Sequence, residues 1–549
     1  MRIAARLPEL RHGGRASGWF APVRHRVGLA LLVGALPALA FPEPAWGWFA
    51  YVALVPWLLL LRSAPSGRQA AIEGWLGGMG FVIAVHHWLV PSLHVFIVVL
   101  GALLGLLWAP WGWLVHSRLS GGLSPSGTAA ALVVVPSGWL MIELVRSWEG
   151  LGGPWGLLGA SQFDVAPALV IASVGGVWLL TLLVVAVNTT IALLIAVPSA
   201  RTAVLTSALV GALVITAMGF AAPRPEESGR IRVAIVQPGV FEGAGERGAE
   251  QRFARGEELT RALVGQRLDL VVWGESSVGA DLGERPDLTA RLTALSRAVG
   301  AEVLVNVDAR RTDGGQGAGI YKSSVLVGPT GLTGDRYDKM RLVPFGEYVP
   351  ARELLGWATS VGRAAGEDRV RGTRTVVMEV ARGDTSVTTA EGGTRIGPLV
   401  CFESAFPDMS RQLTRDGARL LLAQSATSSF QGSWAPEQHA SLAALRAAEN
   451  GRPMVHATLT GVSAVYGAEG DRIGRQLPTD TSATAVYEVP LTRGTTGFVR
   501  FGDWAVQGAA AVLVVLGAWE AARRIRRRAP SPAVRPAHTT HGSARRPGR

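Results

Sequence analysis

The chain has 549 residues, of which 48% are hydrophobic and 18 are tryptophans, and its mean hydropathy is +0.28. This composition is too apolar for an ordinary soluble protein and indicates membrane spans. The net charge of +12 does not indicate a nucleic-acid partner, because the arginines cluster beside apolar runs, at Arg2–Arg26 and Arg523–Arg528. One cysteine excludes an internal disulfide, and no Cys/His cluster has zinc-site spacing, so we expect no metal and no cofactor.

Apolar segments fill the first 222 residues, and we predict spans at 27–42, 48–61, 73–90, 94–116, 128–146, 167–196 and 203–222. The first two are short for a bilayer, which takes about 20 helical residues to cross, and could form a signal peptide or a re-entrant hairpin. Five regions are therefore expected: a basic cytoplasmic N-terminus, a membrane domain, an extracytoplasmic domain, an eighth span and a basic disordered tail. Their predicted bounds are 1–26, 27–222, 223–503, 504–520 and 521–549.

The arginines predict the orientation of the chain in the membrane. If there are eight spans, the arginines beside the span ends fall on one side, which the positive-inside rule makes the cytoplasm. These residues are Arg24, Arg26, Arg62, Arg68, Arg118, Arg201 and the cluster Arg523–Arg528. Arg146 is an exception, because it lies at the outer end of the fifth span. We therefore predict a multi-pass protein of the cytoplasmic membrane with residues 223–503 on the extracytoplasmic face.

Residues 223–503 alternate between short apolar runs and amphipathic stretches. The predicted strands are Ile231–Gln237, Leu268–Trp273, Glu302–Val307, Ser323–Val327, Ile396–Phe402, Arg419–Ala423, Met454–Thr458 and Val462–Tyr466. The predicted helices are 247–265, 286–299 and 436–450. Strands that alternate with helices indicate an α/β or a layered α+β domain.

Three segments carry candidate catalytic residues, each beside a predicted strand. Glu275 ends the run Val271–Glu275, Lys339 follows Tyr337 and Asp338, and Cys401 ends a short apolar run. A thiol at a strand end can be held rigidly towards a cleft, although a lone cysteine is more often a small buried hydrophobe. The compartment predicted for Cys401 permits disulfides, so an isolated thiol there indicates chemistry. The sequence holds two lysines, Lys339 and Lys322, and we predict Lys322 to lie on the surface.

Other residues near these segments have ordinary alternatives. Glu347 could form an ion pair with Arg341, and Glu403 could cap a following helix. A histidine could pair with Cys401 as in papain-like enzymes. The candidates are His439, which the pattern places on a helix surface, and His456, which it places inside a strand. These positions do not favour a cysteine–histidine pair.

The three segments resemble the Glu-Lys-Cys triad of the nitrilase superfamily. With the apolar spans, nearly the whole chain resembles the apolipoprotein N-acyltransferase family. The most specific stretches are KMRLVPFGEYVP at Lys339–Pro350, VCFES around Cys401 and GRPMVHATLTGV at Gly451–Val462. The chain departs from the family pattern at Gln424–Ser425, where an Asn-Asp pair is common, and at Phe402, where tyrosine is common.

The resemblance implies a polytopic α-helical membrane domain plus an extracytoplasmic α-β-β-α nitrilase-like sandwich, an α+β architecture. It implies Glu275 as general base and acid, Lys339 as electrostatic stabiliser and Cys401 as nucleophile. The N–H of Phe402 would join Lys339 in stabilising the oxyanion, and two supporting carboxylates, Glu347 and Glu403, would orient Lys339 or the substrate amine. Because Glu275 must carry a proton, we expect burial to raise its pKa.

The reaction that the resemblance implies has two steps. Cys401 takes an acyl chain from a membrane phospholipid, at the sn-1 ester, and forms a thioester. The N-terminal amine of diacylglyceryl-cysteine in an apolipoprotein then accepts the chain, which is the last step of lipoprotein maturation. The implied partners are the phospholipid donor, the apolipoprotein acceptor and the bilayer, and we expect a monomer. Apolar residues within 351–362 could dip into lipid as a lid.

Two other functions stay open at this point. A membrane-tethered nitrilase-type amidase would use the same triad with water as the acceptor, but it would need only a simple anchor. A transporter or membrane scaffold with a non-catalytic sensor domain would instead use the polar residues of the spans, Glu73, Glu143 and Asn188. The intact triad argues against the second alternative.

Overall fold

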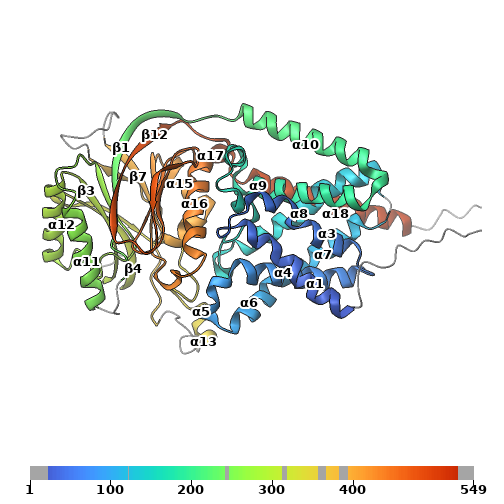
Figure 1. Cartoon of the computed structure of the whole chain (residues 1–549), viewed down its shortest axis with the longest axis horizontal. Helices are drawn as coiled ribbons and strands as arrows, with labels where there is room; N and C mark the ends of the chain where they lie inside the picture. Colours follow the sequence, from blue (N-terminus) through green and yellow to red (C-terminus); the bar gives the residue numbers. More distant parts are fainter. Residues whose placement is uncertain are drawn as a thin grey trace, which may run out of the picture.

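The computed structural model describes residues 23–121, 123–240, 246–311, 318–356, 366–381 and 393–528. A helical bundle and a β-sandwich lie side by side along the long axis of the molecule (Figure 1). Most of the predicted N-terminal region, residues 1–22, and residues 529–549 of the predicted tail lie outside the described residues.

The bundle contains the apolar segments of the sequence. Its helices are α1 (Val23–Ala35), α2 (Ala50–Ala53), α3 (Val55–Arg62), α4 (Gly67–Val85), α5 (Val90–Leu93), α6 (Phe96–Gly105), α7 (Ala109–Leu119), α8 (Pro125–Arg146), α9 (Ala166–Ala196), α10 (Arg201–Ala221) and α18 (Trp504–Arg528). In the described part of the chain, five helical stretches are long and apolar enough to cross a membrane: Phe96–Leu119, Pro125–Arg146, Ala166–Ala196, Pro198–Ala221 and Trp504–Arg523. The chain is thus a multi-pass membrane protein.

The first three predicted spans form differently from the others. The span predicted at 73–90 is broken, because α4 ends at Val85 and the helical stretch His87–Leu93 bends away from it by 65°. The two short predicted spans are the short apolar helical stretches His25–Ala40 and Gly47–Arg62.

The three polar residues singled out in the predicted spans, Glu73, Glu143 and Asn188, have partners within the bundle. Glu73 accepts from Arg26, with Nε 2.6 Å from Oε1. Glu143 accepts from the N–H of Leu158 at 2.7 Å and from the Thr181 hydroxyl at 2.8 Å. The Asn188 amide likewise bonds to backbone groups, at Leu54 N and Ala50 O. Since buried polar groups need partners where no water reaches them, these contacts give the three residues a structural role and weaken the transporter interpretation.

The sandwich consists of two six-stranded sheets. One has the order β12-β1-β2-β3-β4-β5, and the other has the order β11-β10-β9-β8-β7-β6. The strands are β1 (Glu226–Gln237), β2 (Leu270–Trp273), β3 (Glu302–Arg311), β4 (Gly319–Gly328), β5 (Gly331–Asp338), β6 (Met378–Val380), β7 (Thr394–Val400), β8 (Leu420–Ser425), β9 (Met454–Thr458), β10 (Ser463–Tyr466), β11 (Arg472–Leu477) and β12 (Ala483–Arg493). Neighbours β1, β2 and β3 run parallel, as do β7, β8 and β9.

Helices cover the outer face of each sheet. α11 (Glu246–Arg261) and α12 (Pro286–Val299) cover the first sheet, and α15 (Pro407–Arg415) and α16 (Ala435–Asn450) lie between the second sheet and the bundle (Figure 1). A fully buried apolar layer that includes Ile235, Leu304 and Val400 separates the two sheets. The predicted α-β-β-α sandwich is therefore confirmed.

The bundle and the sandwich share one hydrophobic core, which joins α8 and α9 to α15 and α16. At this junction the Trp155 indole donates to the Gln438 side chain at 2.8 Å. Arg146 is buried there, and its Nη1 donates to the Trp155 carbonyl at 2.5 Å. A buried arginine with a backbone partner is a structural residue, which explains why Arg146 departs from the pattern of the other arginines.

Several elements have no counterpart in the prediction. The strands β5, β6, β11 and β12 and the helices α15 and α17 (Gly497–Phe501) are additional. Most of these elements are short, polar or at a sheet edge, so they lack a strong apolar period. α18 also continues to Arg528, past the predicted end of the last span at 520.

Candidate active site

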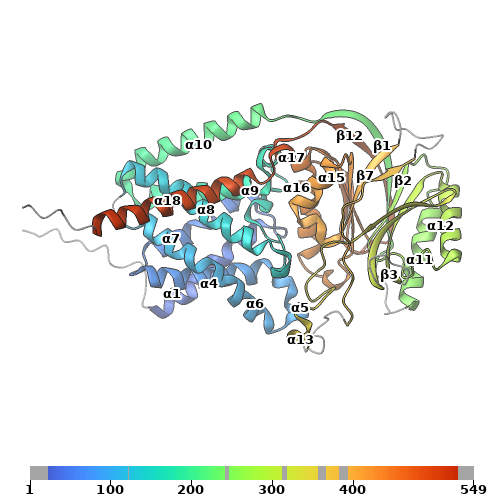
Figure 2. The ribbon, with the colours of Figure 1, turned by 180° about the vertical axis from the view of Figure 1, so that it is seen from behind.

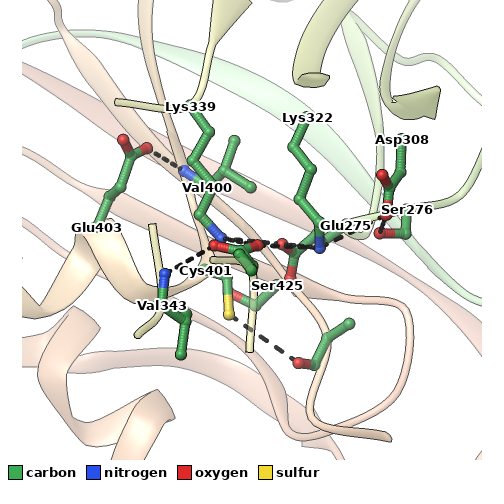
Figure 3. A network of polar contacts seen from close by, with 12 residues as sticks. Glu275, Ser276, Asp308, Lys322, Lys339, Val343, Val400, Cys401, Glu403 and Ser425 are labelled. Carbon is green, nitrogen blue, oxygen red and sulfur yellow. Dashed lines mark hydrogen bonds and ion pairs between the residues drawn. The ribbon is translucent and has the colours of Figure 1, made fainter. Parts of the chain in front are cut away.

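The three candidate catalytic residues meet where strands of the two sheets end. Glu275 follows β2, Lys339 follows β5 and Cys401 follows β7. Although 64 residues separate Glu275 from Lys339, the lysine Nζ lies 3.1 Å from Glu275 Oε1. Cys401 lies beside this pair (Figure 3), and both charges act on the pKa of its thiol. The fold thus brings Glu275, Lys339 and Cys401 together.

The backbone at Cys401 makes a sharp turn. β7 ends at Val400, Cys401 has a φ of 51°, and a 3₁₀ helix runs from Cys401 to Ala405. A positive φ at a non-glycine residue costs about 1–3 kcal/mol and persists only where the surroundings impose it. The turn directs the sulfur towards the site, where it lies 4.0 Å from the Ala426 carbonyl. Burial and then the Glu275 charge raise the thiol pKa to about 12, so the resting group is a thiol.

Two carboxylates and two ammonium groups alternate around a square, which we call the charge ring: Glu275, Lys339, Glu347 and Lys322. Lys339 Nζ lies 3.1 Å from Glu275 Oε1 and 2.7 Å from Glu347 Oε1. Lys322 Nζ lies 2.8 Å and 3.2 Å from the same two oxygens. The prediction that Lys322 lies on the surface is wrong, since its side chain is only 13% exposed. Lysine is scarce in this sequence, and that scarcity pointed to a special role for Lys322 as much as for Lys339.

The ring sets the charge state of its members. Burial alone would raise the pKa of Glu275, but the ammonium groups of Lys322 and Lys339 outweigh it, so that pKa is lowered. The expectation of a raised pKa is therefore wrong. Burial likewise fails to raise the pKa of Glu347, because Lys339 and Lys322 lower it to about 2. Burial would lower the pKa of each lysine, but Glu275 and Glu347 raise both instead.

Glu347 does not pair with Arg341, whereas Glu403 caps the 3₁₀ helix at Cys401 and has further partners besides. Arg341 forms an ion pair with Asp408 instead of with Glu347. Glu403 is fully buried, and its Oε1 accepts from Met340 N at 2.7 Å and from Arg341 N at 3.0 Å. Its Oε2 accepts from Val400 N at 2.8 Å. Glu403 therefore fixes the segment after Lys339 against the turn that carries Cys401.

His439 contacts the backbone of Cys401 instead of its sulfur. The prediction of a helix-surface position is wrong, since His439 is 2% exposed. Its Nε2 lies 3.1 Å from the Cys401 carbonyl oxygen and 3.0 Å from Ser404 Oγ. Burial lowers the pKa of His439 to about 4, so its imidazole is neutral and supports the turn without acting as a base. His456 is buried within β9, as predicted.

Gly274 allows the two sheets to meet directly before Glu275. A Cβ atom at this position would lie 1.9 Å from the nitrogen of Leu459, so no larger residue fits. The N–H of Glu275 donates to the carbonyl of Ser425, at the end of β8, at 3.2 Å. Gln424, which departs from the family pattern, donates to the Trp273 carbonyl at 2.8 Å. Both sheets thus fix the position of Glu275.

Two further predictions concern the surroundings of the site. Phe402 packs edge-on against Phe406, with ring centroids 4.9 Å apart, and it contacts the bundle near Gly153. Of the proposed lid, residues 357–362 lie outside the described residues.

Across the described ranges, no group of three histidine, cysteine, aspartate or glutamate residues is arranged to hold a metal ion.

Comparison with known proteins identifies the relatives of the chain. Its residues 33–190 match the apolipoprotein N-acyltransferase N-terminal domain, and residues 232–496 match the carbon-nitrogen hydrolase family. An apolipoprotein N-acyltransferase of Geobacter metallireducens is 31% identical, over 89% of this chain and 94% of the relative. The chain belongs to the apolipoprotein N-acyltransferase family. One of Azotobacter vinelandii is 32% identical, over 92% of this chain and 97% of the relative. Membership of this family makes the chain an N-acyltransferase.

Solved structures show similarity to about half of this chain. An amidase of the nitrilase superfamily from Nesterenkonia is 18% identical, covers 48% of this chain and 93% of its own, and has a TM-score of 0.33. A carbon-nitrogen hydrolase superfamily protein from Xanthomonas campestris is 19% identical, covers 47% of this chain and 90% of its own, and also has a TM-score of 0.33.

Proposed function

We propose that this protein transfers an acyl chain from a membrane phospholipid to the N-terminal amine of diacylglyceryl-cysteine in apolipoproteins, through a thioester at Cys401. The observation that carries the proposal is the convergence of Glu275, Lys339 and Cys401 at the ends of strands from the two sheets. Family membership supports both substrates. The amidase alternative lacks support from the bundle, which an enzyme that uses water as acceptor would not need.

The first half-reaction forms the thioester. Both ammonium groups of the charge ring lie on Glu275 Oε1, so Oε2 is the oxygen that we expect to take the thiol proton. The sulfur then attacks the ester carbonyl, and Lys339 with the N–H of Phe402 stabilises the oxyanion; one such donor is worth about 3 kcal/mol. Collapse breaks the C–O bond, and Glu275 returns the proton to the departing lysophospholipid oxygen.

The second half-reaction uses the same groups in the same roles. The neutral α-amine attacks the thioester carbon, and Glu275 accepts a proton from the nitrogen. The C–S bond breaks, the amide forms, and Glu275 gives the proton back to the Cys401 sulfur. Charge at Glu275 is therefore the same before and after each half-reaction, as general acid–base catalysis requires.

We also propose that the sandwich lies on the extracytoplasmic face and that the protein works as a monomer. Both α1 and the arginine-bearing end of α18 lie at the end of the bundle far from the sandwich (Figures 1 and 2), which by the positive-inside rule supports a cytoplasmic position for that end. The bundle covers the outer face of α15 and α16, so this face is not available for pairing with a second copy. Native mass spectrometry in detergent checks the monomer.

Trapping of the acyl-enzyme tests the proposed function. Detergent-purified protein is incubated with phospholipid that carries a labelled sn-1 chain, without acceptor. We expect protein-bound label that neutral hydroxylamine releases and that Cys401→Ala lacks. Addition of a diacylglyceryl peptide should then move the label to the peptide. An unlabelled wild-type enzyme in accessible lipid would refute phospholipid as the acyl donor and favour the amidase.

A further inference from the structure

Lys322 makes the same contacts as Lys339 within the charge ring. Its Nζ lies within 3.2 Å of Oε1 of both Glu275 and Glu347. Its effect on the Glu275 pKa exceeds that of Lys339. Lys322 is not one of the three residues of the Glu-Lys-Cys triad, so the roles assigned above do not explain this second ammonium group.

The surroundings of Lys322 hold it in place. It pairs across β3 and β4 with Asp308, whose Oδ2 lies 3.7 Å from its Nζ. Asp308 is fixed in turn by the Ser276 hydroxyl at 3.2 Å and by Arg369 Nε at 3.3 Å. The backbone carbonyl of Lys322 accepts from the N–H of Lys339 at 2.8 Å. The backbones of the two lysines are therefore held side by side, and the contact with Asp308 keeps the Lys322 side chain in place.

The charges explain why the ring needs two cations. Glu275 and Glu347 are both nearly fully buried, and a buried carboxylate without a partner is strongly unfavourable. If Lys339 alone neutralised them, its turn towards an oxyanion would leave two carboxylates unpaired. A compact ammonium can approach both Oε1 atoms, whereas the planar guanidinium fork of arginine suits bidentate pairing with one carboxylate.

We propose that Lys322 is a positioning residue for the acyl transfer: it stays paired with Glu275 and Glu347 while Lys339 turns to the oxyanion, and it keeps Glu275 ionised and ready to accept the thiol proton. The proposal rests on the proposed function. The charged groups that face Lys322 are Glu275, Glu347, Asp308 and Lys339. Of these, the three carboxylates keep its ammonium charged throughout the working pH range.

The test compares Lys322→Met with wild type in single-turnover acylation across pH. Loss of an opposite charge within about 4–6 Å raises a carboxyl pKa by about one to three units. We therefore expect the acidic limb of the acylation rate to move to higher pH by about that amount, with a slower rate at neutral pH. Lys322→Arg keeps the charge and should return the limb towards its wild-type position. Thermal unfolding in detergent verifies that each variant is folded.

A matched control removes one positive charge nearby but outside the ring. Arg310 on β3 is 53% exposed and pairs with Glu367, so Arg310→Met should leave the limb in place. A limb that Lys322→Met does not move, in a folded variant, would overturn the proposal. If wild type itself forms no thioester, the proposed function fails on its own. The role of Lys322 is then decided by alkylation of Cys401 with iodoacetamide, whose pH midpoint should rise in Lys322→Met and stay unchanged if the proposal is wrong.

Discussion

At the scale of single residues, the proton in the resting site belongs to the sulfur. Burial and the Glu275 charge hold the thiol pKa at about 12, while two ammonium groups hold the pKa of Glu275 below its ordinary value. Transfer of the proton before substrate binds is therefore unfavourable. In the proposed mechanism, the transfer is favourable only together with sulfur–carbon bond formation, so the thiol would be protected from side reactions between turnovers.

This charge state predicts how Cys401 alkylation depends on pH. Only the thiolate reacts, so wild-type alkylation by iodoacetamide should keep rising up to about pH 12. Glu275→Gln removes a negative charge that raises the thiol pKa, so the midpoint should move to lower pH. The same variant lacks the base, so acylation should fall by about 10²–10⁴-fold. Stopped-flow alkylation and label trapping measure the two effects.

The matched control for this prediction is Glu367→Gln, which removes a carboxylate from an exposed ion pair with Arg310. It should change neither quantity. A wild-type midpoint near the ordinary thiol value would contradict the prediction, and it would mean that Lys339 dominates over burial at the sulfur.

At the scale of elements, α16 connects the bundle to the turn at Cys401. The helical backbone of α9 is interrupted at Gly175 and Gly176. Directly after this break, the N–H of Val177 donates to Glu449 Oε1 at 2.7 Å. Arg446, one turn earlier on α16, donates to the same carboxylate at 2.7 Å and to the Ala405 carbonyl at 2.7 Å. A continuous series of buried contacts thus joins the break in α9 to the 3₁₀ helix that begins at Cys401.

We predict that Glu449→Ala destabilises the junction. The substitution leaves the Arg446 guanidinium buried beside an unpaired N–H, and removal of one partner of a buried ion pair costs about 3–5 kcal/mol. A lower melting temperature in detergent and a slower acylation rate are the expected results. Glu437→Ala makes the same change on α16 at a residue that only weakly contacts Gln476, and it should have little effect. Equal melting temperatures for the two variants would contradict the prediction.

At the scale of the whole molecule, the bundle exposes many large apolar side chains, whereas the described part of the sandwich exposes few, among them Val240, Val264 and Leu332. α10 lies along the outside of the bundle in both views (Figures 1 and 2). It exposes Leu205, Leu209, Val210, Leu213, Val214 and Phe220. Apolar residues exposed along a whole helix are typical of contact with lipid. The turn at Cys401 packs against the same bundle, which agrees with the proposed use of membrane lipids as substrates.

The proposed orientation predicts which sites an impermeant reagent reaches in intact cells. Because the sequence has one cysteine, Cys401→Ala gives a cysteine-free background. In it, Arg310→Cys on the sandwich should react with a membrane-impermeant maleimide, whereas Arg526→Cys at the end of α18 should react only after lysis. Both positions are exposed. Labelling of Arg526→Cys alone would place the sandwich in the cytoplasm.

The elements and site residues that could be predicted from the sequence are those with a recognisable local pattern. Apolar runs fix where helices lie in a membrane, and short apolar strands with amphipathic helices fix a layered sandwich, because burial follows from the pattern itself. Glu275, Lys339 and Cys401 each follow or abut a short strand-like run, so their segments could be recognised one at a time. β5, β6 and β12 were missed because edge and polar strands carry a weak period.

The way in which the charges act on one another depends on the folded arrangement of the chain. Lys322 precedes a strand in the sequence as a surface lysine would, yet the pairing of β4 with β3 and β5 turns it onto Glu275 and Glu347. Lys322 and Lys339 together lower the pKa of Glu275 against the effect of burial, and no pattern along the chain shows this arrangement. His439 was misjudged for the same reason. The environment of a charge depends on groups that are distant in sequence, and folding alone brings them within a few ångströms.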